Sequence, residues 1–153
     1  MTSPQDTHPD GPTDAEGVIE KMHVAMGEFI LGDARPAVDL FSRGDDVTLG
    51  NPFGPIARGS ERVVEAATQA ATNYRDGEVI GFERVGTYAS ADLACFLEVE
   101  RYRAKMGGRD EMSSVALRVS TVVRREGDGW RIASRHADPI TTPRSPESVI
   151  SER

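Results

Sequence analysis

The sequence predicts an α+β domain in which three N-terminal helices pack on one face of a curved, mainly antiparallel sheet. In the first half of the chain, apolar residues recur at intervals of three and four, the spacing of one helix face. From residue 78 onward, long runs rich in strand-forming residues alternate with short turn sequences. A short strand-like run, 47–49, lies between the second and third helical stretches.

Start and stop signals bound each helical stretch. A capping box begins the first, a proline lies in the first turn of the second, and a serine caps the third. A glycine follows the end of each. The bounding residues, in chain order, are Thr13 with Glu16, Gly32, Pro36, Gly44, Ser60 and Gly77. The second helix is expected over 35–43 and the third over 61–75.

Four strands then form a meander, expected over 79–89, 93–104, 112–125 and 129–138. The domain is expected to span 13–140. The polar residues 1–12 are expected to be a disordered tail, and 141–153 a flexible C-terminal tail.

Composition limits the classes of partner and location. Hydrophobic residues make up 38% of the 153 residues, and no apolar run approaches the roughly 20 residues that cross a bilayer. The formal net charge of −7 disfavours nucleic acid and anionic membranes as partners. One cysteine, Cys95, cannot form an internal disulfide, and the N-terminus has no apolar leader. A soluble, cytoplasmic protein is expected.

The last strand supplies the first candidate site residues. Side chains alternate between the two faces of a strand, so His136 and Asp138 share a face with Trp130 and Ile132. Because tryptophan and isoleucine favour burial, His136 and Asp138 are predicted to point into the interior. The opposite face is expected to carry three arginines as surface or dimer contacts: Arg118, Arg131 and Arg135.

Strand pairing tests this assignment. A two-residue turn at 127–128 places Ile132 opposite Val123 and His136 opposite Val119, which keeps the apolar residues of both strands on one face. Shifting the pairing by one residue would place Trp130 beside arginines.

The preceding hairpin is open to two interpretations. A two-residue turn at Gly107 and Gly108 places Glu100 opposite Val115 and Glu98 opposite Leu117. Four side chains of this strand would then face inward: Phe96, Glu98, Glu100 and Tyr102. A loop of different length would reverse these faces. With the two-residue turn, the outer face is apolar and uncovered by helices, which predicts a homodimer interface formed by Leu97, Val99, Ala116, Val122 and Ala133.

Two stretches, together with the order of the elements, resemble a known family. They are 46–54, Asp-Val-Thr-Leu-Gly-Asn-Pro-Phe-Gly, followed by Arg58-Gly59, and 129–138, Gly-Trp-Arg-Ile-Ala-Ser-Arg-His-Ala-Asp. Over residues 14–140 the chain resembles the SnoaL-like and ketosteroid-isomerase-like proteins of the nuclear-transport-factor-2-like fold. The resemblance implies a cone, with a bent sheet around a long helix and a central cavity that opens at one end. This fold hosts enzymes, binding proteins and association domains.

The resemblance also implies candidate chemistry. In ketosteroid isomerases, an Asp-Pro-x-Gly segment at this place carries the general base. Here the corresponding residue is Asn51, whose amide cannot take a proton at neutral pH, so isomerisation by that mechanism is disfavoured. SnoaL-type cyclases suggest aldol closure by a strand-borne acid or base, a role open to His136 or Asp138. Limonene-type epoxide hydrolysis needs an Asp-Arg-Asp set that has no equivalent here.

The candidate catalytic residues are therefore His136, Asp138, Glu100 and Glu98, with His136 as acid or base and a buried glutamate as a second base. The candidate ligand-binding residues are Asn51, Phe53, Trp130, Tyr102, Met22 and Met26. Each also has a structural interpretation: Asn51 as a turn-former before proline, Asp138 as a cap where the chain leaves the strand, and the apolar residues as core.

No metal site and no cofactor are expected. His136 and Asp138 supply two ligands where three or four are needed, and the other histidines, His8 and His23, lie far away in the sequence.

Two hypotheses for function follow. The first is a small-molecule-binding protein acting as a cofactor-free isomerase, cyclase or dehydratase on an apolar carbonyl compound. The second is a non-catalytic ligand-binding or dimerisation module. A carboxylate and His136 together in an open cavity would favour the enzyme, and a narrow or filled cavity would favour the module.

Overall fold

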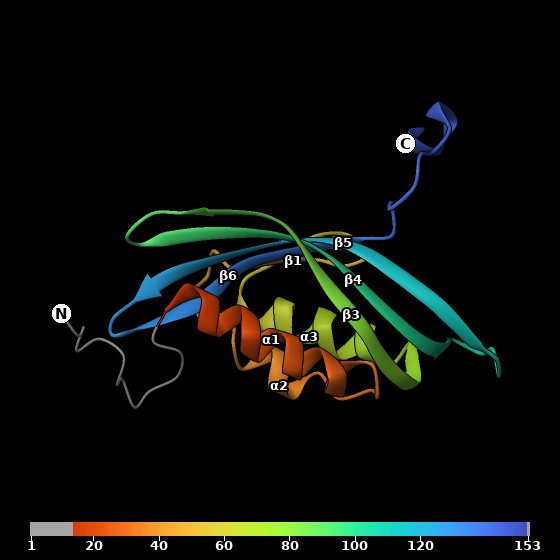
Figure 1. Cartoon of the computed structure of the whole chain (residues 1–153), viewed down its shortest axis with the longest axis horizontal. Helices are drawn as coiled ribbons and strands as arrows, with labels where there is room; N and C mark the ends of the chain where they lie inside the picture. The colour runs from red at the N-terminus through yellow and green to blue at the C-terminus, as the bar shows by residue number, and fades with distance from the viewer. Residues whose placement is uncertain (1–13, 153) are drawn as a thin grey trace.

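A computed structural model describes residues 14–152 of the chain. It confirms the α+β class, with three α-helices and a six-stranded, mixed but mainly antiparallel sheet among these residues. All three helices lie on one face of the sheet, and the other face has no helix over it (Figure 1). The expected tail 1–12 lies outside the described residues, and the domain boundaries stay predictions.

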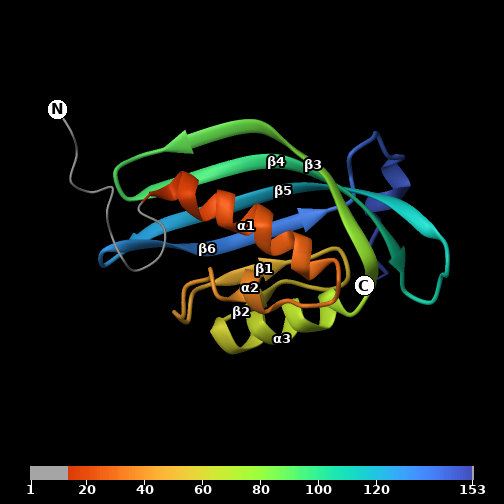
Figure 2. The same cartoon turned by 60° about the horizontal axis from the view of Figure 1, so that its bottom comes forward.

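The sheet has the strand order β2-β1-β6-β5-β4-β3. β1 is parallel to β6, and every other neighbouring pair is antiparallel. β1 and β2 contact the third helix and extend the meander at its β6 edge (Figure 2). The bounds are β1 Thr48–Gly50, β2 Ala57–Arg58, β3 Tyr74–Ala89, β4 Leu93–Met106, β5 Met112–Glu126 and β6 Gly129–Asp138.

The first helix, α1 (Ala15–Phe29), lies obliquely across the sheet and buries one apolar side (Figure 2). Its cap is Asp14, whose carboxylate accepts a hydrogen bond from the Gly17 amide at 2.7 Å. The expected cap Thr13 lies outside the described residues. Gly32 has φ +103°, as expected for the glycine after a helix end.

The second helix, α2 (Arg35–Val38), is shorter than the expected 35–43. After it, the Leu40 carbonyl accepts from the Ile132 amide at 2.9 Å, and the Ser42 amide donates to the Ile132 carbonyl at 2.8 Å. The backbone groups that would have continued the helix therefore pair with β6 instead.

The third helix, α3 (Ser60–Ala71), ends earlier than expected because β3 begins at Tyr74, which pairs with Met106. The Asp76-Gly77 dipeptide, expected to close the helix, lies at an irregularity in β3 between Arg75 and Glu78. Beyond β6 the chain is exposed and contains a short 3-10 turn, Pro146–Val149.

The face assignment in the β4–β5 hairpin is confirmed although its register is not. Glu100 lies opposite Leu117 and Glu98 opposite Val119, two residues from the predicted partners. A shift of two residues preserves the side-chain alternation. The four predicted inward residues of β4 are therefore all buried: Phe96, Glu98, Glu100 and Tyr102.

The prediction that His136 and Asp138 point into the interior is wrong. The predicted register of the last hairpin holds from Gly129 to Ile132, but Val122 then pairs with Ser134. Ala133 is thus an extra residue, a β-bulge that reverses the alternation beyond it. Arg135 and Ala137 are buried, while the His136 side chain is 61% exposed. The expectation that Arg135 lies on the outer face is wrong for the same reason.

Within residues 14–152, no helix is long and apolar enough to cross a membrane. The cytoplasmic location stays a prediction.

Candidate functional site

A small cavity lies between α1, α3 and the inner face of the sheet. Its volume is about 40 Å³, room for only a few water molecules. Most of its wall is apolar, from Met22, Met26, Phe29, Ala37, Phe41, Leu49, Ala67, Ala70, Leu117 and Ala137. The polar side chains on the wall are Asn51, Tyr74 and Arg135.

Four of the six predicted ligand-binding residues line this cavity: Met22, Met26, Asn51 and Phe53. Trp130 and Tyr102 do not. Trp130 packs under Arg125, whose guanidinium carbon lies 4.9 Å from the centroid of the Trp130 ring. The Trp130 indole N–H is buried without a hydrogen-bond partner among the described residues. Tyr102 lies deeper, against Glu100. The binding roles of all six stay predictions.

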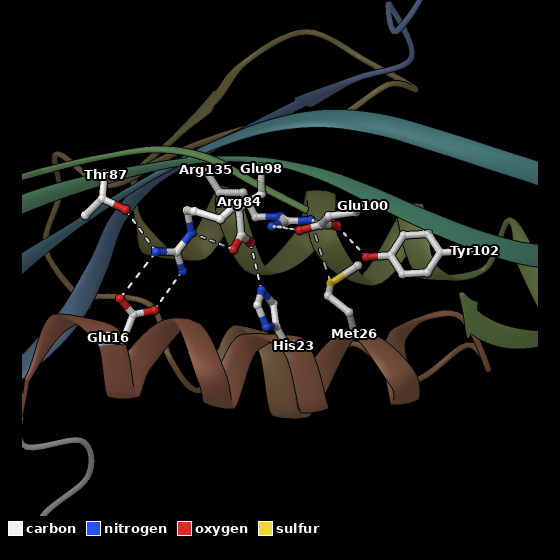
Figure 3. A network of polar contacts seen from close by, with 9 residues as sticks. All are labelled: Glu16, His23, Met26, Arg84, Thr87, Glu98, Glu100, Tyr102 and Arg135. Carbon is white, nitrogen blue, oxygen red and sulfur yellow. Dashed lines mark hydrogen bonds and ion pairs between the residues drawn. The ribbon is translucent and has the colours of Figure 1, made fainter. Parts of the chain in front are cut away.

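Arg135, Glu100 and Tyr102 form a buried polar cluster beside the cavity (Figure 3). Arg135 donates to both oxygens of Glu100, at 2.9 Å from Nη1 and 2.8 Å from Nη2, in the planar two-point geometry of an arginine–carboxylate pair. The Tyr102 hydroxyl donates to Glu100 Oε1. Glu100 is thus fully engaged, and Arg135 is the member that reaches the cavity wall.

Burial and the neighbouring charges together set the protonation of these groups. Burial of Arg135 opposes its charge, but the neighbouring Glu100 carboxylate outweighs this effect and raises the pKa of the guanidinium. Burial, and then the negative charge of Glu100, raise the pKa of the Tyr102 phenol. Burial raises the pKa of Tyr74 to about 12, although the charge of Arg135 opposes the shift. At neutral pH the cavity therefore meets a cationic Arg135 and a neutral Tyr74 phenol.

Tyr74 lines the cavity but was not among the candidate site residues, because it fell within the helix expected over 61–75. It begins β3 instead, with its ring edge-on to Phe29 and Phe53 at 5.8 and 5.9 Å. Its hydroxyl makes no hydrogen bond to another residue within 14–152, so it is available to a ligand in the cavity.

A second polar cluster, of Glu16, His23, Arg84 and Glu98, connects α1 to the sheet (Figure 3). His23 Nε2 lies 2.7 Å from Glu98 Oε1, and Arg84 Nε donates to Glu98 Oε2 at 3.0 Å. Arg84 also pairs with Glu16 at 2.7 Å. Burial of Glu98 opposes its charge, but hydrogen bonds from His23 and Arg84 outweigh it and lower the pKa of the carboxyl group.

The sequence contained a signal for this second cluster. Glu16 and His23 are seven residues apart, so they lie on the same helix face two turns apart. Glu98 was predicted to lie on the inner face of the sheet, the face on which the helices were expected to pack. The position of Arg84 on β3 could not be predicted from the sequence, because three irregularities interrupt the alternation of side chains along this strand.

His136 and Asp138 lie outside the cavity. Asp138 accepts from Arg118 Nε at 2.7 Å and from the Ile140 amide at 2.9 Å. The second bond fits the structural interpretation of Asp138 as a cap where the chain leaves β6. The nearest nitrogen of His136 is 3.8 Å from Asp138, on the outer side of the sheet. The pair is not brought together with Glu98 or Glu100.

Asn51 has the geometry of a turn-former, because its Oδ1 accepts a hydrogen bond from the Phe53 amide at 2.8 Å. Its side-chain NH₂ group is the part that remains for a ligand. Within residues 14–152, no group of three histidine, cysteine, aspartate or glutamate side chains is arranged to hold a metal ion.

Several solved structures have a fold similar to that of this chain. A candidate calcium/calmodulin-dependent protein kinase type II association domain from Thiobacillus denitrificans has a TM-score of 0.72 at 21% identity, over 88% of this chain and 100% of that one. A ketosteroid isomerase-like protein from Erwinia carotovora atroseptica has a TM-score of 0.69 at 18% identity, over 83% of this chain and 94% of that one. A candidate dehydratase of the NTF2-like family from Streptomyces avermitilis has a TM-score of 0.65 at 18% identity, over 84% of this chain and 100% of that one. These likenesses show the NTF2-like fold.

The family follows from the sequence itself. The profile of the SnoaL-like domain matches residues 19–141, most of the chain, and the protein belongs to this family. This confirms the resemblance inferred from the two sequence stretches. A comparison with curated proteins gave no match.

Proposed function

We propose that this SnoaL-like protein binds a small, neutral, mostly apolar molecule through a carbonyl oxygen. In this proposal α1 and the sheet are the walls of the cone, and the cavity beside Arg135 is the binding site. Methionines on the wall favour such a role, because their flexible side chains adapt to the shape of a ligand.

The observation that carries the proposal is that the three polar wall residues can all donate a hydrogen bond to a ligand. The Tyr74 hydroxyl is neutral and free, Arg135 has only donors, and Asn51 has its oxygen engaged and its NH₂ group free. All three therefore offer hydrogens. An apolar cavity with convergent donors suits a ligand with an acceptor oxygen, such as a ketone.

Charge balance favours a neutral ligand over a carboxylate. Arg135 is the cation at the wall, but its charge is already compensated by Glu100 through two hydrogen bonds. The buried pair has no net charge, so an anion entering the cavity would lose its hydration without gaining an unpaired cation.

The pairing of Glu100 with Arg135 also favours binding over catalysis. An isomerase, cyclase or dehydratase acting on a ketone needs a base near the substrate. Among the described residues no carboxylate or histidine lines the cavity, and Glu100, which pairs with the wall residue Arg135, is held by Arg135 and Tyr102. We therefore place non-catalytic binding of a carbonyl compound first, and cofactor-free catalysis by Glu100 second.

A pair of isosteric probes tests the proposal. Cyclopentanone is expected to bind about fivefold more tightly than methylenecyclopentane, because one hydrogen bond contributes about 1 kcal/mol. Tyr74→Phe is expected to remove most of this preference and to leave methylenecyclopentane binding unchanged. Titrations followed by the methyl resonances of Met22 and Met26 measure both affinities.

Tyr88→Phe is the matched control, because Tyr88 is exposed and lies outside the cavity. It should retain the preference for the ketone, and isobutyrate should bind more weakly than cyclopentanone. Equal affinities for the two isosteres in the unmodified protein, or an unchanged preference in Tyr74→Phe, would refute the role of the cavity.

We further propose that two copies pair through the outer sheet face. That face carries partly buried apolar side chains, among them Leu97, Val99 and Val122, and no helix covers it (Figure 1). Nearby charges are internally paired, Arg118 with Asp138 and Arg101 with Glu83, so these four residues bring no unpaired charge to the contact.

Sedimentation equilibrium is expected to give twice the mass of the chain, and Val99→Glu is expected to give the monomer with an unchanged circular dichroism spectrum. Val64→Glu, at an exposed position on α3, is the control and should stay dimeric. A monomer at all concentrations of the unmodified protein would exclude this pairing.

A further inference from the structure

A second hollow lies outside the cavity, between the loop that follows β1 and the exposed side of α3. It is an open groove of about 750 Å³. The loop side is apolar, with Pro55 and Ile56, and the helix side is polar, with Glu65 and Gln69. Its volume lies in the range of small-molecule sites, whereas the cavity alone is far below that range.

The cavity and the groove share a wall. Asn51, Phe53 and Ala70 line both hollows, so at this point the partition is about one side chain thick. Phe53 is the largest of the three, and 47% of it is exposed, which is unusual for an aromatic residue at a cavity wall.

Phe53 lies where it can separate the two spaces or join them. Its ring meets the ring of the cavity residue Tyr74 edge-on at 5.9 Å, while Phe53 itself also lines the groove. The segment has irregular backbone, and Gly54 next to it has open space where a side chain would be. Because Phe53 lines both hollows, a rotation of its ring would open a path between them.

We propose that the two hollows form one bipartite site with Phe53 as the gate between them. The ligand is then an elongated molecule whose apolar ketone end lies in the cavity and whose hydroxyl-bearing tail lies in the groove. The tail contacts Ile56 and Pro55 on one side, and its hydroxyl donates one hydrogen bond to Glu65 on the other, where Gln69 also lies. This inference rests on the proposed function, because the cavity must bind the ketone end.

Two ketones and two methyl reporters test the inference. Met26 lines only the cavity and Ile56 lines only the groove. Cyclopentanone is expected to shift the Met26 methyl resonance and to leave the Ile56 methyl resonance unchanged. The longer 4-(4-hydroxycyclohexyl)cyclohexanone is expected to shift both, and to bind about fivefold more tightly than 4-cyclohexylcyclohexanone, the gain from one hydrogen bond. Glu65→Ala should reduce that gain.

Phe53→Ala is expected to raise the association rate of the longer ketone by about one decade, the low end of the range seen among variants of one binding surface. Phe29→Ala is the matched control, because Phe29 also meets Tyr74 edge-on but does not line the groove. It should alter cyclopentanone affinity without accelerating entry of the longer ketone.

The outcomes separate the two proposals. If cyclopentanone shifts Met26 but the longer ketone leaves Ile56 unshifted in both the unmodified protein and Phe53→Ala, the groove is not part of the site. If the longer ketone binds equally fast with and without Phe53, the gate is refuted. If neither ketone shifts Met26, the proposed function itself fails, and the bipartite site with it.

Discussion

Replacing Arg135 by methionine is expected to lower the free energy of unfolding by about 3–5 kcal/mol. The Arg135 and Glu100 side chains are 7% and 1% exposed, so the change leaves a carboxylate buried without its cation. The Tyr102 hydroxyl alone cannot replace two charge-assisted hydrogen bonds. Urea denaturation measures the loss, and Glu100→Gln, which leaves the cation unpaired, should give a loss of similar size.

The double variant Arg135→Met with Glu100→Leu should recover most of this stability, because two apolar side chains replace an ion pair that is costly to desolvate. Arg101→Met is the control, since the Arg101–Glu83 pair is exposed and should contribute less than about 1 kcal/mol. Single variants no worse than Arg101→Met, or a double variant as unstable as the singles combined, would show that the pair does not act as a unit.

The position of Arg135 also shows why the central site prediction failed. Alternation along β6 placed Trp130 and Ile132 correctly, and the pairing with β5 was correct up to Val123. One extra residue, Ala133, then exchanged the two faces. The residues 130–138 contain neither glycine nor proline, so the sequence gives no indication of a bulge there. Bulge placement depends on pairing with β1 and with the segment around Phe41, which are distant in sequence.

The β4–β5 hairpin shows the opposite behaviour. The predicted register was shifted by two residues, yet Glu98 and Glu100 lie inward as predicted, because an even shift preserves the faces. The sequence therefore identified the two buried carboxylates but not the cations that hold them. Arg84 and Arg135 both follow irregularities, in β3 and β6, where periodicity carries no information.

The cavity was only partly predictable. Met22 and Met26 follow from helical spacing and Asn51 and Phe53 from the family resemblance, and all four line it. Tyr74 does not follow, because its place depends on where α3 ends. We expect that end to be set by the close contact of Gly77, in the irregularity of β3, with Ile30 at the end of α1.

Substituting Gly77 by alanine tests this contact and is expected to lower the free energy of unfolding by about 3 kcal/mol, the upper part of the range for overpacking. A Cβ at Gly77 would lie 2.5 Å from the Ile30 carbonyl oxygen and 2.6 Å from its Cβ. Ile30 is fully buried, and its carbonyl accepts from the Gly77 amide at 3.2 Å, so relief requires α1 to move away from β3. For a domain of this size, thermal unfolding should shift downward by about 6–12 °C.

Gly81→Ala, in the same strand, isolates the steric cause. No atom lies within 4 Å of a Cβ built there, so its effect should stay within about 0.5 kcal/mol. Since α1 carries Met22 and Met26, Gly77→Ala should also weaken cyclopentanone binding, whereas Gly81→Ala should not. Equal stability of the two variants would mean that α1 is not fixed by Gly77, and the position of Tyr74 at the cavity would then need another cause.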